Sequence, residues 1–120
     1  MVTLTKAEEK IMMILWDIEK GFIKDIQDQY PDPKPPYNSI STIVRVLVQK
    51  EIVGYTAYGK SHQYHPLVSK EQYTKSFMKG FVSKYFSGSY QQMVSFFTKE
   101  DNLSLRELEE LLRELKNKKP

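Results

Sequence analysis

Apolar residues recur at helical spacing in three stretches of the first half of the chain. In the stretch 37–55, YNSISTIVRVLVQKEIVGY, they are Ile40, Ile43, Val44 and Leu47, at i, i+3, i+4 and i+7, which is the spacing of one buried helical stripe. TKAEEKIMMILWDIEK and FIKDIQDQY also place their apolar residues on one helical face. The sequence therefore predicts three helices, at about residues 5–20, 22–30 and 38–50.

Residues with strong positional preferences mark the ends of these helices. Thr5 and Glu8 have the spacing of a capping box, and Asn38 is a favourable N-cap residue for the third helix. Gly21 is expected to end the first helix, and Pro31 to stop the second. The proline-rich segment PDPKPPYN connects the second helix to the third.

Two β-biased runs follow the third helix. IVGYTAY and HQYHP are separated by GKS, which predicts a β-hairpin with a basic tip. Three helices followed by a hairpin is the order of elements in a winged helix-turn-helix domain. We therefore expect a mostly α fold with a small β-hairpin (α+β), in which residues 1–66 form a winged-helix DNA-binding domain and residues 67–120 a helical dimerisation region.

The face of the third helix opposite its apolar stripe is polar and contains no acidic residue. A merely solvated face usually mixes Glu with Lys, so an acid-free face indicates a polyanionic partner. In a winged helix the third helix can enter the DNA major groove while the hairpin tip meets the phosphate backbone. The predicted DNA contacts are Asn38, Ser39, Ser41, Thr42, Arg45 and Gln49 of the helix, with Arg45 suited to guanine, and Tyr58, Lys60 and Ser61 of the hairpin.

The distribution of charge is consistent with this hypothesis. Residues 34–66 carry four basic residues against the single acid Glu51, a net charge of +3, whereas residues 1–33 carry four lysines against seven acids, a net charge of −3. Positive charge is thus concentrated around the third helix and the hairpin, as expected for a phosphate-binding surface.

The second half of the chain predicts further helices whose apolar faces need a partner. Two separate apolar faces exceed what a small winged domain can cover, which favours a homodimer. The alternative is that these helices fold back to complete a single core. The predicted dimer contacts are Tyr73, Phe77 and Phe81 after a Ser69–Gln72 capping box, Met93 and Phe97 in a helix from about Ser89, and Leu105, Leu108, Leu112 and Leu115 at heptad spacing.

Composition argues against several other classes of protein. The chain has no cysteine, so it has neither disulfides nor a thiolate ligand or nucleophile. His62 and His65 would point to opposite faces of a strand, which disfavours joint metal binding, and we predict no metal and no cofactor. We also predict no enzymatic activity, because the carboxylate pair Glu109 and Glu110 has no base or nucleophile nearby. No apolar run reaches the ~18 residues of a membrane span, so we expect a cytoplasmic protein without direct membrane insertion.

Four segments together resemble the penicillinase repressor family, whose members include repressors of β-lactamase and of methicillin resistance. They are LTKAEEKIMMILWD, NSISTIVRVLVQKEIV, GYTAYGKSHQYHP and FFTKEDNLSLRELEELLREL. The most specific elements are the Trp16-Asp17 pair, the Ser39-x-x-Thr42 pattern and the ordered tail. The resemblance implies a homodimeric bacterial repressor that binds a palindromic DNA operator, often at an antibiotic-resistance gene.

The resemblance also implies a mode of induction. Members of the family are cut within the dimerisation region in response to a membrane metalloprotease sensor, and loss of the dimer then releases the operator. The cut falls on an Asn-Phe bond in relatives, and the matching residues here are Phe96 and Phe97, with Phe96 in place of the Asn. The alternative for these two residues is that both pack the dimer interface.

Two other functions stay open at the level of sequence. The helical half could enclose a small-molecule pocket lined by its aromatic residues, as in ligand-responsive winged-helix regulators. A winged helix can also serve as a protein-interaction module that binds no operator.

Overall fold

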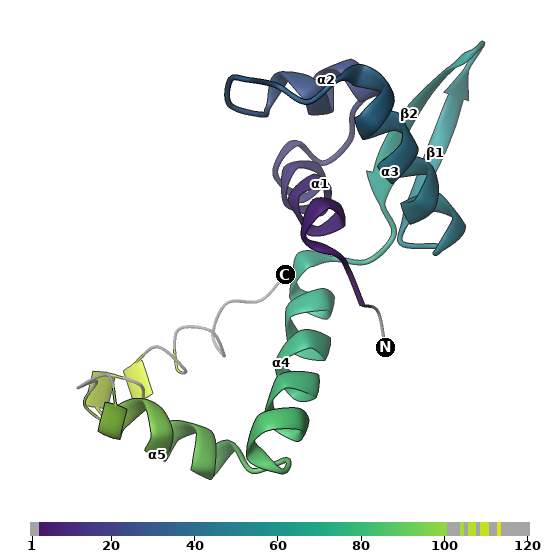
Figure 1. The fold of residues 1–120 in the computed structure, drawn as a ribbon. Coiled ribbons are helices and arrows are strands. Elements are labelled where there is room, and N and C mark those ends of the chain that lie inside the picture. The colour runs from purple at the N-terminus through teal and green to yellow at the C-terminus, as the bar shows by residue number, and fades with distance from the viewer. Residues whose placement is uncertain (1–2, 101–103, 105, 108, 111–112, 114–120) are drawn as a thin grey trace. The chain divides into compact units, whose positions relative to one another are not determined.

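The computed structural model describes residues 3–100, 104, 106–107, 109–110 and 113. These residues form α1 (Lys6–Ile18), α2 (Ile23–Asp28), α3 (Tyr37–Gln49), β1 (Val53–Tyr58), β2 (Ser61–Pro66), α4 (Lys70–Phe86) and α5 (Tyr90–Glu100) (Figure 1). The order α-α-α-β-β followed by helices confirms the predicted winged-helix arrangement within a mostly α fold.

The chain divides into two compact units, Met1–Tyr73 and Thr74–Pro120, which we call unit 1 and unit 2. The division lies inside α4, whereas the sequence placed the boundary between residues 66 and 67. Unit 1 therefore contains the winged helix together with the first turn of α4.

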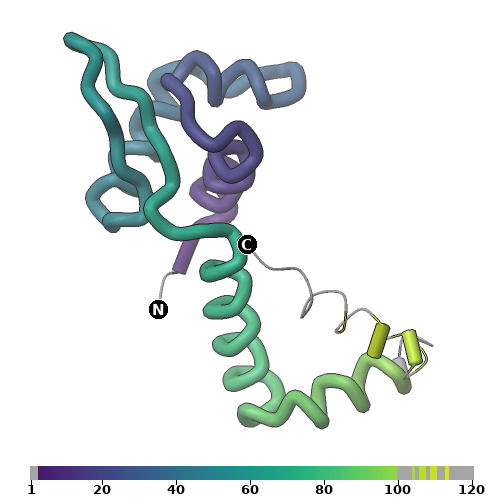
Figure 2. The backbone as a smooth tube through the Cα atoms, turned by 180° about the vertical axis from the view of Figure 1, so that it is seen from behind, coloured from purple at the N-terminus to yellow at the C-terminus, as the bar shows by residue number. Residues whose placement is uncertain are grey.

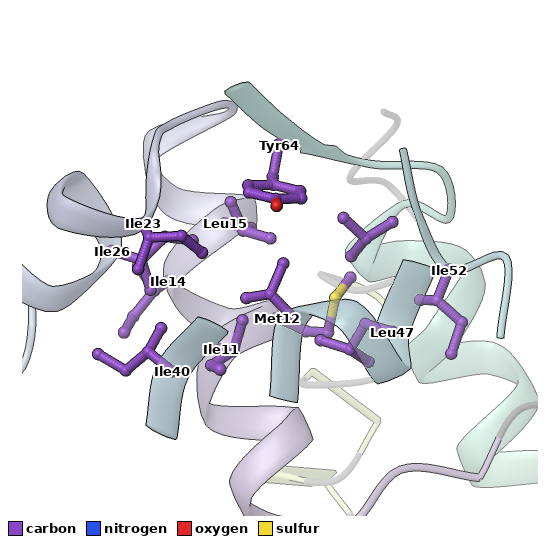
Figure 3. Packing of buried hydrophobic residues seen from close by; sticks show 12 residues of the cluster. Ile11, Met12, Ile14, Leu15, Ile23, Ile26, Ile40, Leu47, Ile52 and Tyr64 are labelled. Atoms are coloured by element: carbon purple, nitrogen blue, oxygen red, sulfur yellow. The ribbon is translucent and has the colours of Figure 1, made fainter. Parts of the chain in front are cut away.

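Unit 1 is built around one hydrophobic core to which α1, α2, α3 and the hairpin all contribute (Figure 3). The helical stripes predicted from the sequence point into this core, because burying an apolar side chain contributes about 1.5–3 kcal/mol. Tyr64 brings the hairpin into the same cluster. The core side chains with 0% exposure are Ile11, Met12, Leu15, Ile26, Val44 and Leu47.

The hairpin pairs β1 and β2 antiparallel, in register from Val53 opposite Pro66 to Tyr58 opposite Ser61. Its turn consists of Gly59 and Lys60, and Gly59 has a φ of 63°. Gly59 has a positive φ and Lys60 does not, which is the pattern of a type II′ turn and matches the twist of the two strands. The hairpin lies at one edge of unit 1 in both views (Figures 1 and 2).

The predicted role of Gly21 as the end of the first helix is wrong. α1 ends at Ile18, and the following residue, Glu19, has a positive φ of 72°. Gly21 instead forms a β-bridge with Tyr64, with N–H···O distances of 2.9 and 2.8 Å. A Cβ atom at Gly21 would lie 2.9 Å from the Ile18 side chain and 3.1 Å from Asp25 Cβ, so there is little space for a larger residue at this position.

The predicted N-cap of the third helix is also wrong. α3 begins at Tyr37, and its N-cap residue is Pro36, which makes no side-chain capping hydrogen bond. The carbonyl of Pro36 accepts hydrogen bonds from the backbone N–H groups of Ser39 and Ile40, at 3.1 and 3.2 Å. Asn38 therefore lies within the first turn, where its carbonyl accepts a hydrogen bond from the Thr42 hydroxyl at 2.9 Å.

Candidate nucleic-acid interface

The polar face of α3 is exposed, opposite the buried residues Ile40, Val44 and Leu47. Of the predicted helix contacts, Ser41 is half-buried, and the exposed ones are Asn38, Ser39, Thr42, Arg45 and Gln49. The face carries a guanidinium, hydroxyls and carboxamides, which are the groups that read base edges and phosphates in DNA.

A cleft of about 580 Å³ lies between the start of α2, the first half of α3 and the hairpin. Residues predicted from the sequence as DNA contacts line much of it, namely Asn38, Ser41, Arg45, Lys60 and Ser61. Ser39, Thr42, Gln49 and Tyr58 are exposed but do not line the cleft. The structure thus brings the basic hairpin tip and the start of α3 to one site.

The sequence pattern did not predict six residues of this cleft, among them Lys24, Tyr37 and His62. Lys24 belongs to the short helix α2, outside the basic segment, and only the fold places it beside the hairpin. Side chains alternate between the two faces of a strand, which places His62 and His65 on opposite faces of β2. This alternation was the sequence signal that could have indicated the position of His62.

One aromatic contact joins the hairpin to the start of α2, and another joins its two strands. The Tyr58 ring lies 6.0 Å from the ring of Phe22, the residue preceding α2, and the Tyr55 ring stacks on His62 at 4.1 Å. Tyr64 is 8% exposed, and burial raises the pKa of its phenol, opposed in part by the charge of Arg45. The phenol therefore stays neutral at physiological pH and places no negative charge beside Arg45.

An ion pair joins α1 to the C-terminal end of α3. The carboxylate of Glu8, a residue 5% exposed, accepts hydrogen bonds from Lys50 Nζ on both oxygens at 2.9 Å, and from the Thr5 backbone N–H at 2.9 Å. Burial by itself raises the pKa of Glu8, but the hydrogen bonds from Thr5 and Lys50 outweigh it and hold the pKa below its usual value. Glu8 is therefore ionised at neutral pH, and the pair helps to position α3.

The start of α4 is fixed to α1 within unit 1. The Trp16 Nε1–H donates to the Val68 carbonyl at 2.8 Å, and the Tyr73 hydroxyl donates to Glu9 Oε2 at 3.1 Å. The Trp16 and Tyr73 rings are 5.5 Å apart, and Tyr73 is 9% exposed. Burial and the Glu9 carboxylate both raise the Tyr73 pKa. Tyr73 therefore packs against α1 within unit 1, and its contact across a dimer stays a prediction.

Unit 2 carries a chain of aromatic rings along α4 and α5. Neighbouring ring centroids are 5.1 Å apart for Phe81 and Tyr85, and 5.7 Å apart for Phe86 and Phe96. Of the predicted dimer contacts, Phe77 is 50% exposed, Phe81 and Phe97 are half-buried and Met93 is buried. The predicted contacts outside the described residues are Leu105, Leu108, Leu112 and Leu115.

The chain matches the model of the penicillinase repressor family over residues 4–117. It belongs to the penicillinase repressor family. The chain is 30% identical over 120 residues to the methicillin resistance regulatory protein MecI of Staphylococcus aureus (strain N315), a match that covers 97% of this chain and 94% of the relative. It is 25% identical over 124 residues to the penicillinase repressor of Bacillus licheniformis, with the same two coverages.

Membership of the penicillinase repressor family confirms the resemblance noted from the sequence and makes the chain a bacterial transcriptional repressor of a family that regulates antibiotic resistance. The match covers nearly the full length of the chain, so both units belong to the region that the family shares.

Two kinds of feature are absent from the part of the chain that the structure describes. No helix among them has the length and apolar character needed to cross a membrane. No three of their His, Asp and Glu side chains form a group that could hold a metal ion.

Proposed function

We propose that this member of the penicillinase repressor family is a homodimer that binds a palindromic operator through unit 1 and dimerises through unit 2. The observation that carries the proposal is the exposed, acid-free face of α3, which continues into a cleft containing Arg45 and Lys60. Such a surface suits a DNA duplex, because bases are read in the major groove while cations contact the phosphates on either side.

Arg45 and Lys60 have different roles in the proposed recognition of DNA. Arg45 lies in the middle of α3, and a guanidinium in the major groove can bond guanine O6 and N7 together, which discriminates against other bases. Lys60 lies at the hairpin tip, and an ammonium group there contacts phosphate without reading sequence. Arg45 therefore provides specificity in the proposal, and Lys60 provides affinity for any sequence.

The exposed aromatic residues of unit 2 support dimerisation. Phe77, Tyr85, Tyr90 and Phe96 are each 48–62% exposed, and burial against a second copy would remove this apolar surface from water. A two-fold dimer matches a palindromic operator, since both half-sites are then read by identical surfaces. Linking two half-site contacts raises the affinity by a factor of about 10² to 10⁴.

Cleavage in unit 2 would release the operator by undoing that linkage. In the proposal the cut falls at Phe96–Phe97, which lies inside α5. A protease binds an extended segment, so α5 has to open locally before the bond is cut. Cleavage would separate the two halves of α5 and remove part of the aromatic surface.

The proposal is tested by a gel shift on DNA fragments from upstream of the chain's own operon, at two salt concentrations and with nonspecific competitor. We expect one discrete complex on an inverted repeat. Arg45→Ala should weaken binding to that fragment by about 1–3 kcal/mol and relax sequence preference, whereas Lys60→Ala should weaken binding to all fragments alike. Binding that is weak and independent of sequence would contradict operator recognition and favour a protein-interaction module.

A further inference from the structure

We infer that the cleft between α2, α3 and the hairpin receives a phosphate group of the DNA backbone, held by Lys24 and Lys60 and, when it is protonated, by His62. The inference rests on the proposed operator binding. It adds to that proposal a contact from α2 and a contact that depends on pH.

The cleft is suited to an anion by its charges. Lys24 comes from α2, Arg45 from α3 and Lys60 from the hairpin, so three elements each place one cation at the cleft. No carboxylate is among the side chains that line it. Asp25, which neighbours Lys24 in the chain, accepts a hydrogen bond from the Phe22 backbone N–H at 2.9 Å.

Lys24 can exchange its present partner for a phosphate. Its Nζ lies 4.0 Å from Asp28 Oδ1, and the two side chains are 77% and 53% exposed. An exposed ion pair of this kind contributes at most about 1 kcal/mol. A hydrogen bond from an ammonium group to a phosphate is shorter and stronger, so the DNA backbone competes well for this lysine.

His62 occupies the cleft face of β2. Its ring stacks on Tyr55 with an interplanar angle of 6°, and the pair supports a charged imidazole because the face of a phenol ring attracts cations. The charged or titratable side chains around it are Lys24 of α2, Tyr37 and Arg45 of α3, and Tyr55, Lys60 and Tyr64 of the hairpin. These groups are cations or neutral phenols at physiological pH.

Phosphate binding changes the balance of charge at His62. A bound phosphate favours a positive charge on the imidazole beside it. A histidine side chain exchanges its proton in the physiological pH range. DNA binding should therefore draw a proton onto His62, and the affinity for DNA should rise as the pH falls from 8 to 6.

The chain offers matched controls for His62 and for Lys24. His65 lies on the same strand, but its side chain is on the opposite face, beside Gly54, and it does not line the cleft. Lys6 lies in the first turn of α1, close to the Glu8–Lys50 pair at the C-terminal end of α3, whereas the cleft is at the other end of α3. Each control removes the same chemical group as its partner variant.

The test measures the dissociation constant of the full chain for its operator and for unrelated DNA, across a range of salt concentrations and at pH 6, 7 and 8. Lys24→Ala should lower the slope of log K against log salt by about 1 on both DNAs, and Lys6→Ala should leave it unchanged. The wild-type protein should bind several-fold more tightly at pH 6 than at pH 8. His62→Gln should abolish that difference, and His65→Gln should keep it.

Thermal unfolding of each variant checks that the fold is kept, which we expect because the Lys24 side chain is mostly exposed and His62 is not in the core. An unchanged salt slope in Lys24→Ala, or an unchanged pH dependence in His62→Gln, would overturn the inference while operator binding by the wild-type protein stands. Absence of operator binding by the wild-type protein would overturn the proposed function as well.

Discussion

The two units of the molecule differ in how far their apolar side chains are buried. In unit 1, helices and hairpin gather twelve buried residues into one core, from Ile11 to Tyr64. In the described part of unit 2, the buried apolar side chains are Val82 and Met93, while Phe77, Tyr85, Tyr90 and Phe96 are about half exposed or more. The aromatic rings of unit 2 mostly contact one another along α4 and α5.

This difference in burial indicates which unit can be stable without a partner. A single winged helix closes its core within one chain, so its stability should be independent of protein concentration. A pair of helices with exposed aromatic faces gains its apolar burial by association, and its stability should rise with protein concentration by mass action. The proposed division of labour, with DNA contacts on unit 1 and dimerisation by unit 2, follows this physical difference.

The largest effect is expected from a cavity in unit 1. Leu47→Ala removes a side chain with 0% exposure and should destabilise unit 1 by about 2–5 kcal/mol. Urea denaturation monitored by Trp16 fluorescence would measure the loss, which should be the same at low and high protein concentration. A strong dependence of this loss on concentration would show that the core of unit 1 also needs a partner.

A smaller effect is expected on dimerisation. Phe77→Glu places a charge on the exposed aromatic face of α4 and should weaken the dimer at least about tenfold, because burying a large apolar side chain contributes about 1.5–3 kcal/mol. Sedimentation equilibrium would measure the dimer dissociation constant. Ser83→Glu, an exposed position on the same helix, is the control. Equal dimerisation of Phe77→Glu and the wild type would remove this face from the interface.

The smallest effect concerns the acid stability of unit 1. The pKa of Glu8 is lowered in the folded state, so its ionisation stabilises the fold above the usual glutamate pKa, and this contribution is lost as the pH falls through the folded-state value. Glu8→Gln should cost about 1 kcal/mol at pH 7 and much less at pH 3.

Urea denaturation at both pH values would measure this difference, with the exposed Glu19→Gln as the control. An equal loss for Glu8→Gln at pH 7 and pH 3 would show that the charge of Glu8 contributes nothing to unit 1.

The fold could be predicted where local pattern and tertiary packing agree. The stripe formed by Ile40, Val44 and Leu47 predicted both the helix and its buried face, because helical spacing itself decides which side chains can share a core. The hairpin followed from its β-biased runs and from Gly59 in the turn. Helix ends were less predictable, since Asn38 and Pro36 lie two residues apart and both suit the start of a helix.

The candidate site could be predicted only in part. Arg45 and Lys60 belong to a locally basic segment, but Lys24 reaches the cleft only because α2 packs beside α3. Tyr73 looked like part of an apolar stripe of α4, and its contact with Glu9, 64 residues earlier in the chain, has no signal in a local pattern. Contacts between residues distant in sequence depend on the assembled fold, which the sequence pattern alone does not specify.

In the proposed function, unit 2 couples two DNA-binding copies of unit 1. The most direct test compares the affinity of the wild-type protein for the complete inverted repeat and for a single half-site of equal DNA length, and repeats the comparison with Phe77→Glu. We predict that the wild type binds the complete repeat about 10² to 10⁴ times more tightly, and that the variant loses this advantage but keeps its half-site affinity. Equal wild-type affinity for the half-site and the complete repeat would contradict the proposed coupling.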